Sequence, residues 1–310
     1  MSEQYTLTLV ASDNPLSESI LGAVEVVLME YDVGEVAPPK WLSENKAIDF
    51  YLEKCPEKEG IEAIKNVLTH VRVDFFIQPE EGRRKKLLIS DMDSTIIAEE
   101  TLDEIASELG LKPLVSAITE RAMKGELDFE TALRKRVALL AGKSIDALEK
   151  VRKNIHFNQG AHILVQTMRR HGALCILVSG GFTYYTSYVA RECEFHHHHS
   201  NDMQVKNKKI TGYVEEPILG AGAKLSFMRE YMAQKRLKPD QVIAIGDGAN
   251  DLEMIKNAGL GIGYYPKPVL EQETLNVIRF GDLTAALYAQ GYQEKEFRRP
   301  IAHNTIRMKK

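Results

Sequence analysis

Short, continuously apolar runs recur in the chain from residue 87 onward, and each ends in a polar or glycine-rich turn. They are Leu87–Ile89, Ala173–Val178, Val242–Ile245 and Leu260–Ile262. Runs of this kind are typical of strands buried on both faces of a parallel sheet, and the helical segments between them would form the crossovers. The pattern therefore predicts an α/β fold with a doubly wound parallel sheet, which binds ligands at the carboxyl ends of its strands.

The segment after the first of these strands has only helical periodicity. Its apolar spacing predicts helices over residues 102–109, 113–124, 129–140 and 145–155. We expect residues 101–157 to form a helical-bundle cap above the strand ends, in the position of a lid. Further along, alternating residues on either side of Lys-Asn-Lys-Lys predict a hairpin within 201–214.

The first eighty residues differ, because strand and helix patterns alternate there. The patterns predict strands over 5–10, 47–52 and 71–77, helices over 17–29 and 61–68, and a connecting loop over 33–44. We interpret residues 1–80 as a small N-terminal α+β domain, followed by a second domain over 85–290. Residues 291–310 are interpreted as a C-terminal extension.

Composition and charge narrow the function classes. The chain has 310 residues, 40 basic and 44 acidic side chains and a net charge of −4. This balance argues against nucleic acid or a membrane as a partner, and the basic clusters 83–86 and 206–209 are interpreted as solvated loops. The three cysteines are far apart, and the first residues lack a leader-like apolar stretch, so we expect a cytoplasmic protein without disulfides.

Polar side chains follow the predicted strands where catalytic groups would be expected. Asp91 and Asp93 follow the first strand, Ser179 and Gly180 follow the second, and Asp247 follows the third. Isolated Lys224 lies in a small-residue segment, and Asn250 and Asp251 come shortly after Asp247. These residues could supply a nucleophile, a proton carrier, an anion site, a cation and a metal-binding carboxylate. Such a set indicates phosphoryl transfer.

These residues also carry a family resemblance. The motifs DMDST (91–95), the serine of SGGFT (179–183), Lys224 and GDGAND (246–251) resemble, in order and spacing, the four motifs of the haloacid dehalogenase superfamily. Three further stretches narrow the resemblance to its phosphoserine phosphatases: ETLDEIA (100–106), GELDF (125–129) and LRKRV (133–137). The resemblance extends from residue 87 to about residue 285.

The resemblance implies a mechanism and a cofactor. Asp91 would attack phosphorus and form an aspartyl phosphate, while Asp93 would first donate and then accept a proton. Mg²⁺ would be held by Asp91, the backbone carbonyl of Asp93 and Asp247, an all-oxygen ligand set. Ser179, Gly180 and Lys224 would hold the phosphate oxygens, and Asn250 and Asp251 would orient the phosphate, Lys224 or metal-bound water.

It also implies a substrate. Glu100 matches the acidic residue that receives the substrate ammonium, and Arg136 matches the arginine that binds the substrate carboxylate. The neighbours Glu99 and Arg134 are alternatives for these two roles. Two apolar residues, Met123 and Phe129, match lid residues that exclude water, although ordinary helix packing explains them as well. The substrate implied is the small molecule O-phospho-L-serine, hydrolysed in the last step of serine biosynthesis.

Other interpretations stay open at this stage. The enzyme could act on another small phosphomonoester or transfer phosphate to homoserine. Alternatively, the chain could be a serine sensor with weak catalysis, since residues 1–80 weakly resemble amino-acid-binding regulatory domains that often dimerise; a role in forming a homodimer explains this unit equally well. His196–His199 departs from the family pattern and is interpreted as a solvated loop.

Overall fold

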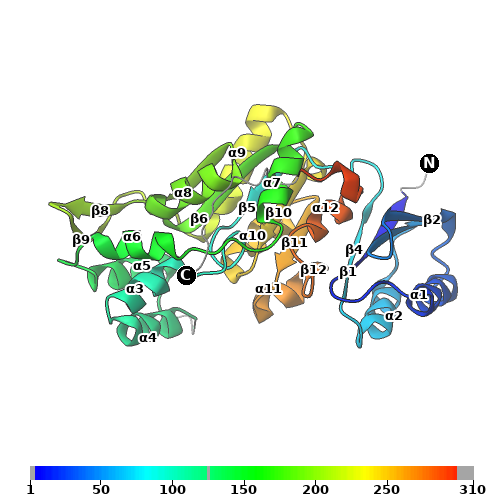
Figure 1. Ribbon diagram of the computed structural model, residues 1–310, viewed down its shortest axis with the longest axis horizontal. Helices are drawn as coiled ribbons and strands as arrows, with labels where there is room; N and C mark the ends of the chain where they lie inside the picture. Colours follow the sequence, from blue (N-terminus) through cyan, green and yellow to red (C-terminus); the bar gives the residue numbers. More distant parts are fainter. Residues whose placement is uncertain (1–3, 124–125, 299–310) are drawn as a thin grey trace, which may run out of the picture.

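The computed structural model describes residues 4–123 and 126–298, which include two large sheets (Figure 1). The larger sheet has six strands in the order β12-β11-β10-β5-β6-β7, and all neighbours are parallel. Its strands are β5 (Leu87–Ser90), β6 (Leu174–Phe182), β7 (His197–Asn201), β10 (Val242–Gly246), β11 (Leu260–Tyr264) and β12 (Asn276–Ile278). The predicted α/β fold is confirmed, and the strand order reverses between β5 and β10, where such sheets bind ligands.

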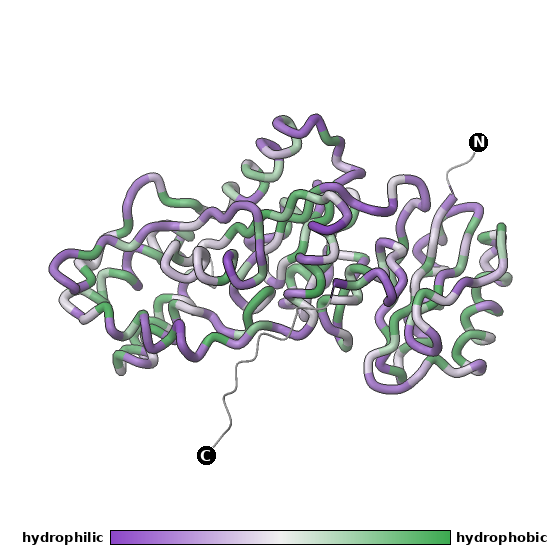
Figure 2. Tube along the Cα trace, turned by 45° about the horizontal axis from the view of Figure 1, so that its top comes forward, coloured by the Kyte–Doolittle hydropathy of each residue, from purple (hydrophilic) through white to green (hydrophobic). Residues whose placement is uncertain are grey.

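Helices cover both faces of this sheet because its strands are apolar on both sides. One face packs against α9 (Ala221–Lys235), α10 (Leu252–Lys256) and α11 (Pro268–Glu273). The other packs against α7 (Ala161–Arg170), α8 (Thr183–Cys193) and α12 (Ala285–Ala289). Neighbouring strand residues alternate between the two cores, so Leu87 belongs to the first core and Leu88 to the second. In Figure 2 the trace is hydrophobic along the central strands and mainly hydrophilic in the loops.

The segment between β5 and α7 is helical. It contains α3 (Thr101–Glu108), α4 (Lys112–Met123), α5 (Phe129–Ala138) and α6 (Asp146–Lys153). These helices begin and end within a few residues of the expected positions. The hairpin of β8 (Met203–Lys206) and β9 (Lys209–Val214) lies beside them at one end of the molecule (Figure 1), where the Gly142 N–H donates to the Ile210 carbonyl at 2.8 Å. No helix in the described ranges is long and apolar enough to cross a bilayer.

The smaller sheet lies at the opposite end of the molecule (Figure 1) and is antiparallel, in the order β2-β3-β1-β4. Its elements are β1 (Tyr5–Ala11), α1 (Glu18–Glu30), β2 (Glu35–Ser43), β3 (Ala47–Leu52), α2 (Lys58–Leu68) and β4 (Val73–Pro79). Residues of α1 and α2 share one core with one face of this sheet. On the other face, Val10 and Phe76 belong to the same core as Tyr288 of α12. The sheet is therefore buried on both faces.

The structure corrects three local predictions. The expected loop over 33–44 contains β2, an edge strand whose pairing with β3 has register shifts. His196–His199 does not form a solvated loop, because His197–Asn201 is β7 at the edge of the parallel sheet. There His199 stacks on Phe227 with ring centroids 3.9 Å apart. Strand β6 also runs through Ser179 and Gly180, so α8 begins only at Thr183.

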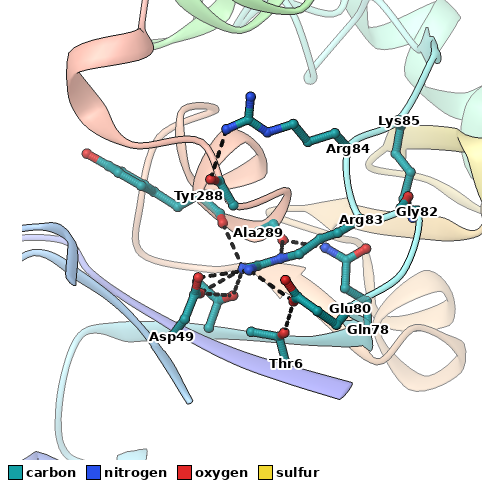
Figure 3. A network of polar contacts seen from close by, with 12 residues as sticks. Thr6, Asp49, Gln78, Glu80, Gly82, Arg83, Arg84, Lys85, Tyr288 and Ala289 are labelled. Atoms are coloured by element: carbon teal, nitrogen blue, oxygen red, sulfur yellow. Dashed lines mark hydrogen bonds and ion pairs between the residues drawn. The ribbon is translucent and has the colours of Figure 1, made fainter. Parts of the chain in front are cut away.

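The segment between the two sheets is pinned by buried polar groups, which corrects the interpretation of residues 83–86 as solvated. The Arg83 guanidinium is buried and binds both carboxylate oxygens of Asp49 in β3, at 2.7 and 2.8 Å (Figure 3). It also donates from Nε to the carbonyl of Ala289 in α12 at 3.0 Å. Nearby, both carboxylate oxygens of Asp74 in β4 accept backbone N–H groups from residues 279–281. These bonds hold the smaller sheet against the larger domain.

The chain beyond α12 also contacts this domain. Tyr292 is buried in the same core, and Phe297 packs against it. The Arg298 N–H donates to Thr167 Oγ1 at 2.8 Å. Of the segment interpreted as an extension, residues 291–298 therefore lie on the larger domain, whereas residues 299–310 lie outside the described ranges.

A buried lysine in the same segment gives the protein an expected pH dependence. Burial lowers the pKa of Lys85 from 10.5 to about 8. Between these two values the unfolded chain binds more protons than the folded protein, so this group makes the free energy of unfolding rise with pH. We expect Lys85→Met to be more stable than the wild type at pH 7, by up to about 3 kcal/mol, with the difference falling to about 1 kcal/mol by pH 10.

Urea unfolding between pH 7 and pH 10 would measure this difference. The matched control is Lys86→Met, because Lys86 is exposed and adjacent. Parallel stability curves for Lys85→Met and the wild type would show that the Lys85 side chain carries no desolvation penalty.

Candidate active site

The candidate site is a cavity of about 120 Å³ at the carboxyl ends of β5, β6 and β10. Nine of the predicted site residues line it: Asp91, Asp93, Glu100, Phe129, Arg136, Ser179, Gly180, Asp247 and Asn250. A larger cavity of about 540 Å³ lies between the two sheets and shares none of these residues. We identify the smaller cavity as the site because the titratable groups converge there.

Lys224 lies buried between two carboxylates. Its Nζ is 2.8 Å from Asp91 Oδ2 and 2.5 Å from Asp251 Oδ1. The other oxygen of Asp251 accepts the backbone N–H groups of Asp247 and Gly248 at 3.2 and 3.1 Å. Burial lowers the pKa of Lys224, but the two carboxylates more than offset this and raise it above its ordinary value. Lys224 is thus held as a cation beside Asp91.

A glycine makes this arrangement possible. A Cβ built on Gly246, the last residue of β10, would lie 2.2 Å from Asp251 Cγ. Any side chain at position 246 would therefore displace the carboxylate that positions Lys224.

Asp91 and Asp93 differ in their surroundings although both are buried. Burial and the charge of Asp251 raise the pKa of Asp91 to about 7, against the opposing effect of Lys224. Burial, then Glu100 and Asp91, raise the pKa of Asp93 to about 8. Asp93 Oδ1 accepts the N–H of Thr101 at 3.0 Å, and Oδ2 accepts the Ser179 hydroxyl at 3.3 Å. Asp93 therefore holds a proton at neutral pH, as a general acid must.

The acidic groups fit a hard divalent cation. Three buried carboxylates, of Asp91, Asp247 and Asp251, offer oxygens that all lie within 4.8 Å of one another. Both oxygens of Asp251 are occupied by Lys224 and by backbone N–H groups, which leaves Asp91 and Asp247 as side-chain ligands. An all-oxygen donor set with no histidine or thiolate suits Mg²⁺.

The structure separates the paired alternatives for the substrate-binding residues. Glu100 lines the cavity, whereas Glu99 points to His156, whose Nδ1 is 2.7 Å from Glu99 Oε1. Arg136 lines the cavity and its pKa is lowered by burial, whereas Arg134 is half exposed and pairs with Glu216. Of these four residues, Glu100 and Arg136 are thus the two that line the cavity, and their roles stay predictions.

Phe129 lies against Gly180 where both line the cavity. A Cβ on Gly180 would lie 2.9 Å from Phe129 Cζ, so only glycine lets the ring approach this closely. Asn250 and Phe129 also line a small neighbouring cavity that Lys224 borders. Met123 ends α4, but its side chain lies outside what the structure describes. The roles of all these residues remain predictions.

Two cavity residues with polar side chains, Thr101 and Lys267, were missed by the sequence analysis. Thr101 donates its N–H to Asp93 Oδ1 at 3.0 Å. Lys267 follows β11 and reaches Glu100 Oε1 at 3.1 Å and Asp247 Oδ2 at 3.0 Å. A sequence signal for Lys267 existed, because it follows the fourth apolar run just as the other site residues follow theirs.

Comparisons with known proteins agree with this geometry. Residues 88–256 match the haloacid dehalogenase-like hydrolase family. Phosphoserine phosphatase from Archaeoglobus fulgidus is 38% identical over 201 residues, which are 64% of this chain and 58% of the relative. Phosphoserine phosphatase from Streptococcus thermophilus is 42% identical over 199 residues, covering 64% of this chain and 93% of the relative. The match thus spans less than two thirds of the archaeal relative.

Solved structures extend the comparison. A haloacid dehalogenase family hydrolase from Salmonella enterica superposes with a TM-score of 0.81 at 26% identity, covering 92% of this chain and 98% of that chain. The match therefore extends into the N-terminal sheet. A structure described as a phospho-aspartyl intermediate analogue of phosphoserine phosphatase has a TM-score of 0.62 at 37% identity, covering 66% of this chain and 98% of that chain. The chain belongs to the haloacid dehalogenase-like hydrolases.

Proposed function

We propose that this protein is a Mg²⁺-dependent phosphatase that hydrolyses O-phospho-L-serine to L-serine and phosphate. The observation that carries the proposal is the pairing of Asp91 with Lys224 at 2.8 Å in the cavity where Asp93 keeps its proton at neutral pH. Phosphoserine phosphatases are among the similar proteins, which supports the choice of substrate.

In the first step, an Asp91 carboxylate oxygen attacks phosphorus in line with the serine oxygen. A bond forms between Asp91 and phosphorus, the bond from phosphorus to the serine oxygen breaks, and Asp93 gives its proton to that oxygen. Lys224 and the Ser179 hydroxyl stabilise the negative charge on the phosphoryl oxygens. Because Lys224 is already held as a cation by two carboxylates, little reorganisation is needed as that charge develops.

In the second step, water attacks phosphorus of the aspartyl phosphate. Asp93 is now a carboxylate and takes the proton from this water, while the bond between phosphorus and Asp91 breaks. Phosphate leaves, and both side chains return to their initial protonation states. One group thus serves as acid and then as base, which suits a pKa of about 8.

We propose that Mg²⁺ is held by the side chains of Asp91 and Asp247 and by the backbone carbonyl of Asp93. When bound, the ion neutralises phosphate charge and aligns the phosphoryl group with Asp91. The buried carboxylate cluster supports this ligand set.

Free, buried Cys175 and Cys193 fit a reducing compartment, so we propose that the enzyme works in the cytoplasm.

The amino-acid part of the substrate is assigned to Glu100 and Arg136. We expect Arg136→Met to lower kcat/KM for phosphoserine by about 10²-fold, because the substrate carboxylate loses its bidentate partner. Arg134→Met, two residues away on the exposed side of α5, should change it by less than about threefold. Steady-state kinetics of both variants would test the assignment, and equal losses would contradict it.

Phosphate release tests the whole proposal. The substrates would be O-phosphoserine, phosphothreonine, sugar phosphates and p-nitrophenyl phosphate, each with Mg²⁺ or with EDTA. We expect a strong, Mg²⁺-dependent preference for phosphoserine. Preference for another ester would keep the catalytic residues and reject the roles of Glu100 and Arg136.

A further inference from the structure

Lys267 joins the two halves of the site. Its Nζ lies 3.1 Å from Glu100 Oε1 and 3.0 Å from Asp247 Oδ2. Glu100 comes from the start of the cap and Asp247 from the end of β10, so one ammonium group bridges the predicted substrate end and the predicted metal end. The proposed mechanism assigns no role to this lysine.

The backbone fixes where this lysine stands. The Lys267 N–H donates to the carbonyl of Asp247 at 2.7 Å, and Pro268 follows as the first residue of α11. The loop leaves β11 with a positive φ of 41° at Tyr265, whose hydroxyl donates to the Gly281 carbonyl at 3.2 Å. Lys267 therefore extends into the cavity from an anchored loop.

The contacts of Glu100 show what Lys267 does there. Glu100 is the N-cap residue of α3, but its side chain makes no capping bond. Instead, Oε1 accepts the Ser94 hydroxyl at 2.9 Å and pairs with Lys267. With Oε1 occupied twice, the second oxygen is left to receive an ammonium group from the substrate.

We propose that Lys267 is a positioning residue that orients the Glu100 carboxylate and thereby sets the preference for phosphate esters that carry an amino group. Without Lys267, the carboxylates of Glu100 and Asp247 would repel each other across the cavity. The half-exposed Glu100 would then turn towards water and lose its fixed orientation. The inference rests on the proposed function, because it assumes that Glu100 binds the substrate ammonium.

Two substrates separate this role from a general one. O-Phospho-L-serine carries the amino group, whereas 3-phosphonooxypropanoate is the same molecule without it. We expect Lys267→Met to lower kcat/KM about tenfold for phosphoserine and only about twofold for the analogue, while Lys267→Arg keeps most of the activity on both. The control is Lys256→Met. Lys256 is a similarly exposed lysine whose Nζ lies 2.6 Å from Glu273 Oε2, and neither residue lines the cavity.

A double-mutant cycle tests whether Lys267 acts through Glu100. The variant with both Lys267→Met and Glu100→Gln should be no slower on phosphoserine than Glu100→Gln alone. The inference would be overturned if the losses of the two single variants multiplied in the double variant. It would also be overturned if Lys267→Met lost activity equally on both substrates, or preferred phosphoserine more strongly than the wild type does. Thermal unfolding of each variant would identify a loss of activity that is caused by misfolding. If Lys267→Met misfolds, the comparison of the two substrates is made with Lys267→Arg.

The same data distinguish a failure of the proposed function. A wild type that hydrolyses both substrates equally would reject phosphoserine as the substrate, and the inference with it. If the wild type prefers phosphoserine and Lys267→Met keeps that preference unchanged, the inference about Lys267 is overturned and the proposed function stands.

Discussion

Asp91→Asn is expected to lower phosphoserine hydrolysis by about 10⁴-fold or more, the size of loss typical of removing a catalytic nucleophile. An amide nitrogen or oxygen cannot form the aspartyl phosphate, so both chemical steps fail. Lys224 keeps its 2.5 Å contact with Asp251 in this variant, so we expect it to fold. Near-wild-type thermal unfolding together with lost turnover would separate chemistry from stability.

Trapping the intermediate makes this test specific. Acid quenching of the wild type with ³²P-labelled phosphoserine should leave label on the protein, and hydroxylamine should remove it. Asp91→Asn should carry no label, whereas Asp146→Asn, an exposed substitution in the cap, should be labelled normally. Label on the Asp91→Asn protein would show that another group is the nucleophile.

Arg83→Met is expected to give the largest loss of stability. The substitution leaves the Asp49 carboxylate buried without its bidentate partner, and it leaves the Ala289 carbonyl without the Arg83 donor. Removing one partner of a buried ion pair costs about 3–5 kcal/mol. Urea unfolding followed by fluorescence should show this loss.

Two controls make the interpretation sharper. Arg84→Met removes the adjacent, half-exposed arginine, which pairs with Glu296 at 2.9 Å, and should cost about 1 kcal/mol or less. Asp49→Leu combined with Arg83→Met removes both charges and should recover part of the stability. If Arg83→Met and Arg84→Met were equally stable, the network in Figure 3 would contribute little to the fold.

The sequence predicted the parallel sheet because both faces of its strands are buried, which leaves continuous apolar runs. Edge strands carry a weaker signal. Strand β2 contains Pro38 and Pro39 and pairs irregularly with β3, and β7 is largely histidine, so both were interpreted as loops. Their pairing depends on neighbours distant in sequence, which periodicity cannot reveal.

The site, like the fold, could be predicted from the sequence only in part. Residues in recognisable motifs, such as Asp91, Asp93 and Asp247, line the cavity together. Arg83 and Lys267 stand in no such motif, and their environments arise only when distant segments meet. A basic residue in a polar segment usually lies in solvent, so nothing local indicated that Arg83 is buried.

The face of the N-terminal sheet that packs on α12 has a practical consequence for truncation experiments. A fragment ending near residue 80 would present Val10 and Phe76 to water, and the remaining chain would present the buried side of α12. Newly exposed apolar patches of this kind promote aggregation. Each half expressed alone is therefore expected to be poorly soluble, so ligand titrations aimed at the N-terminal unit are best done on the whole chain.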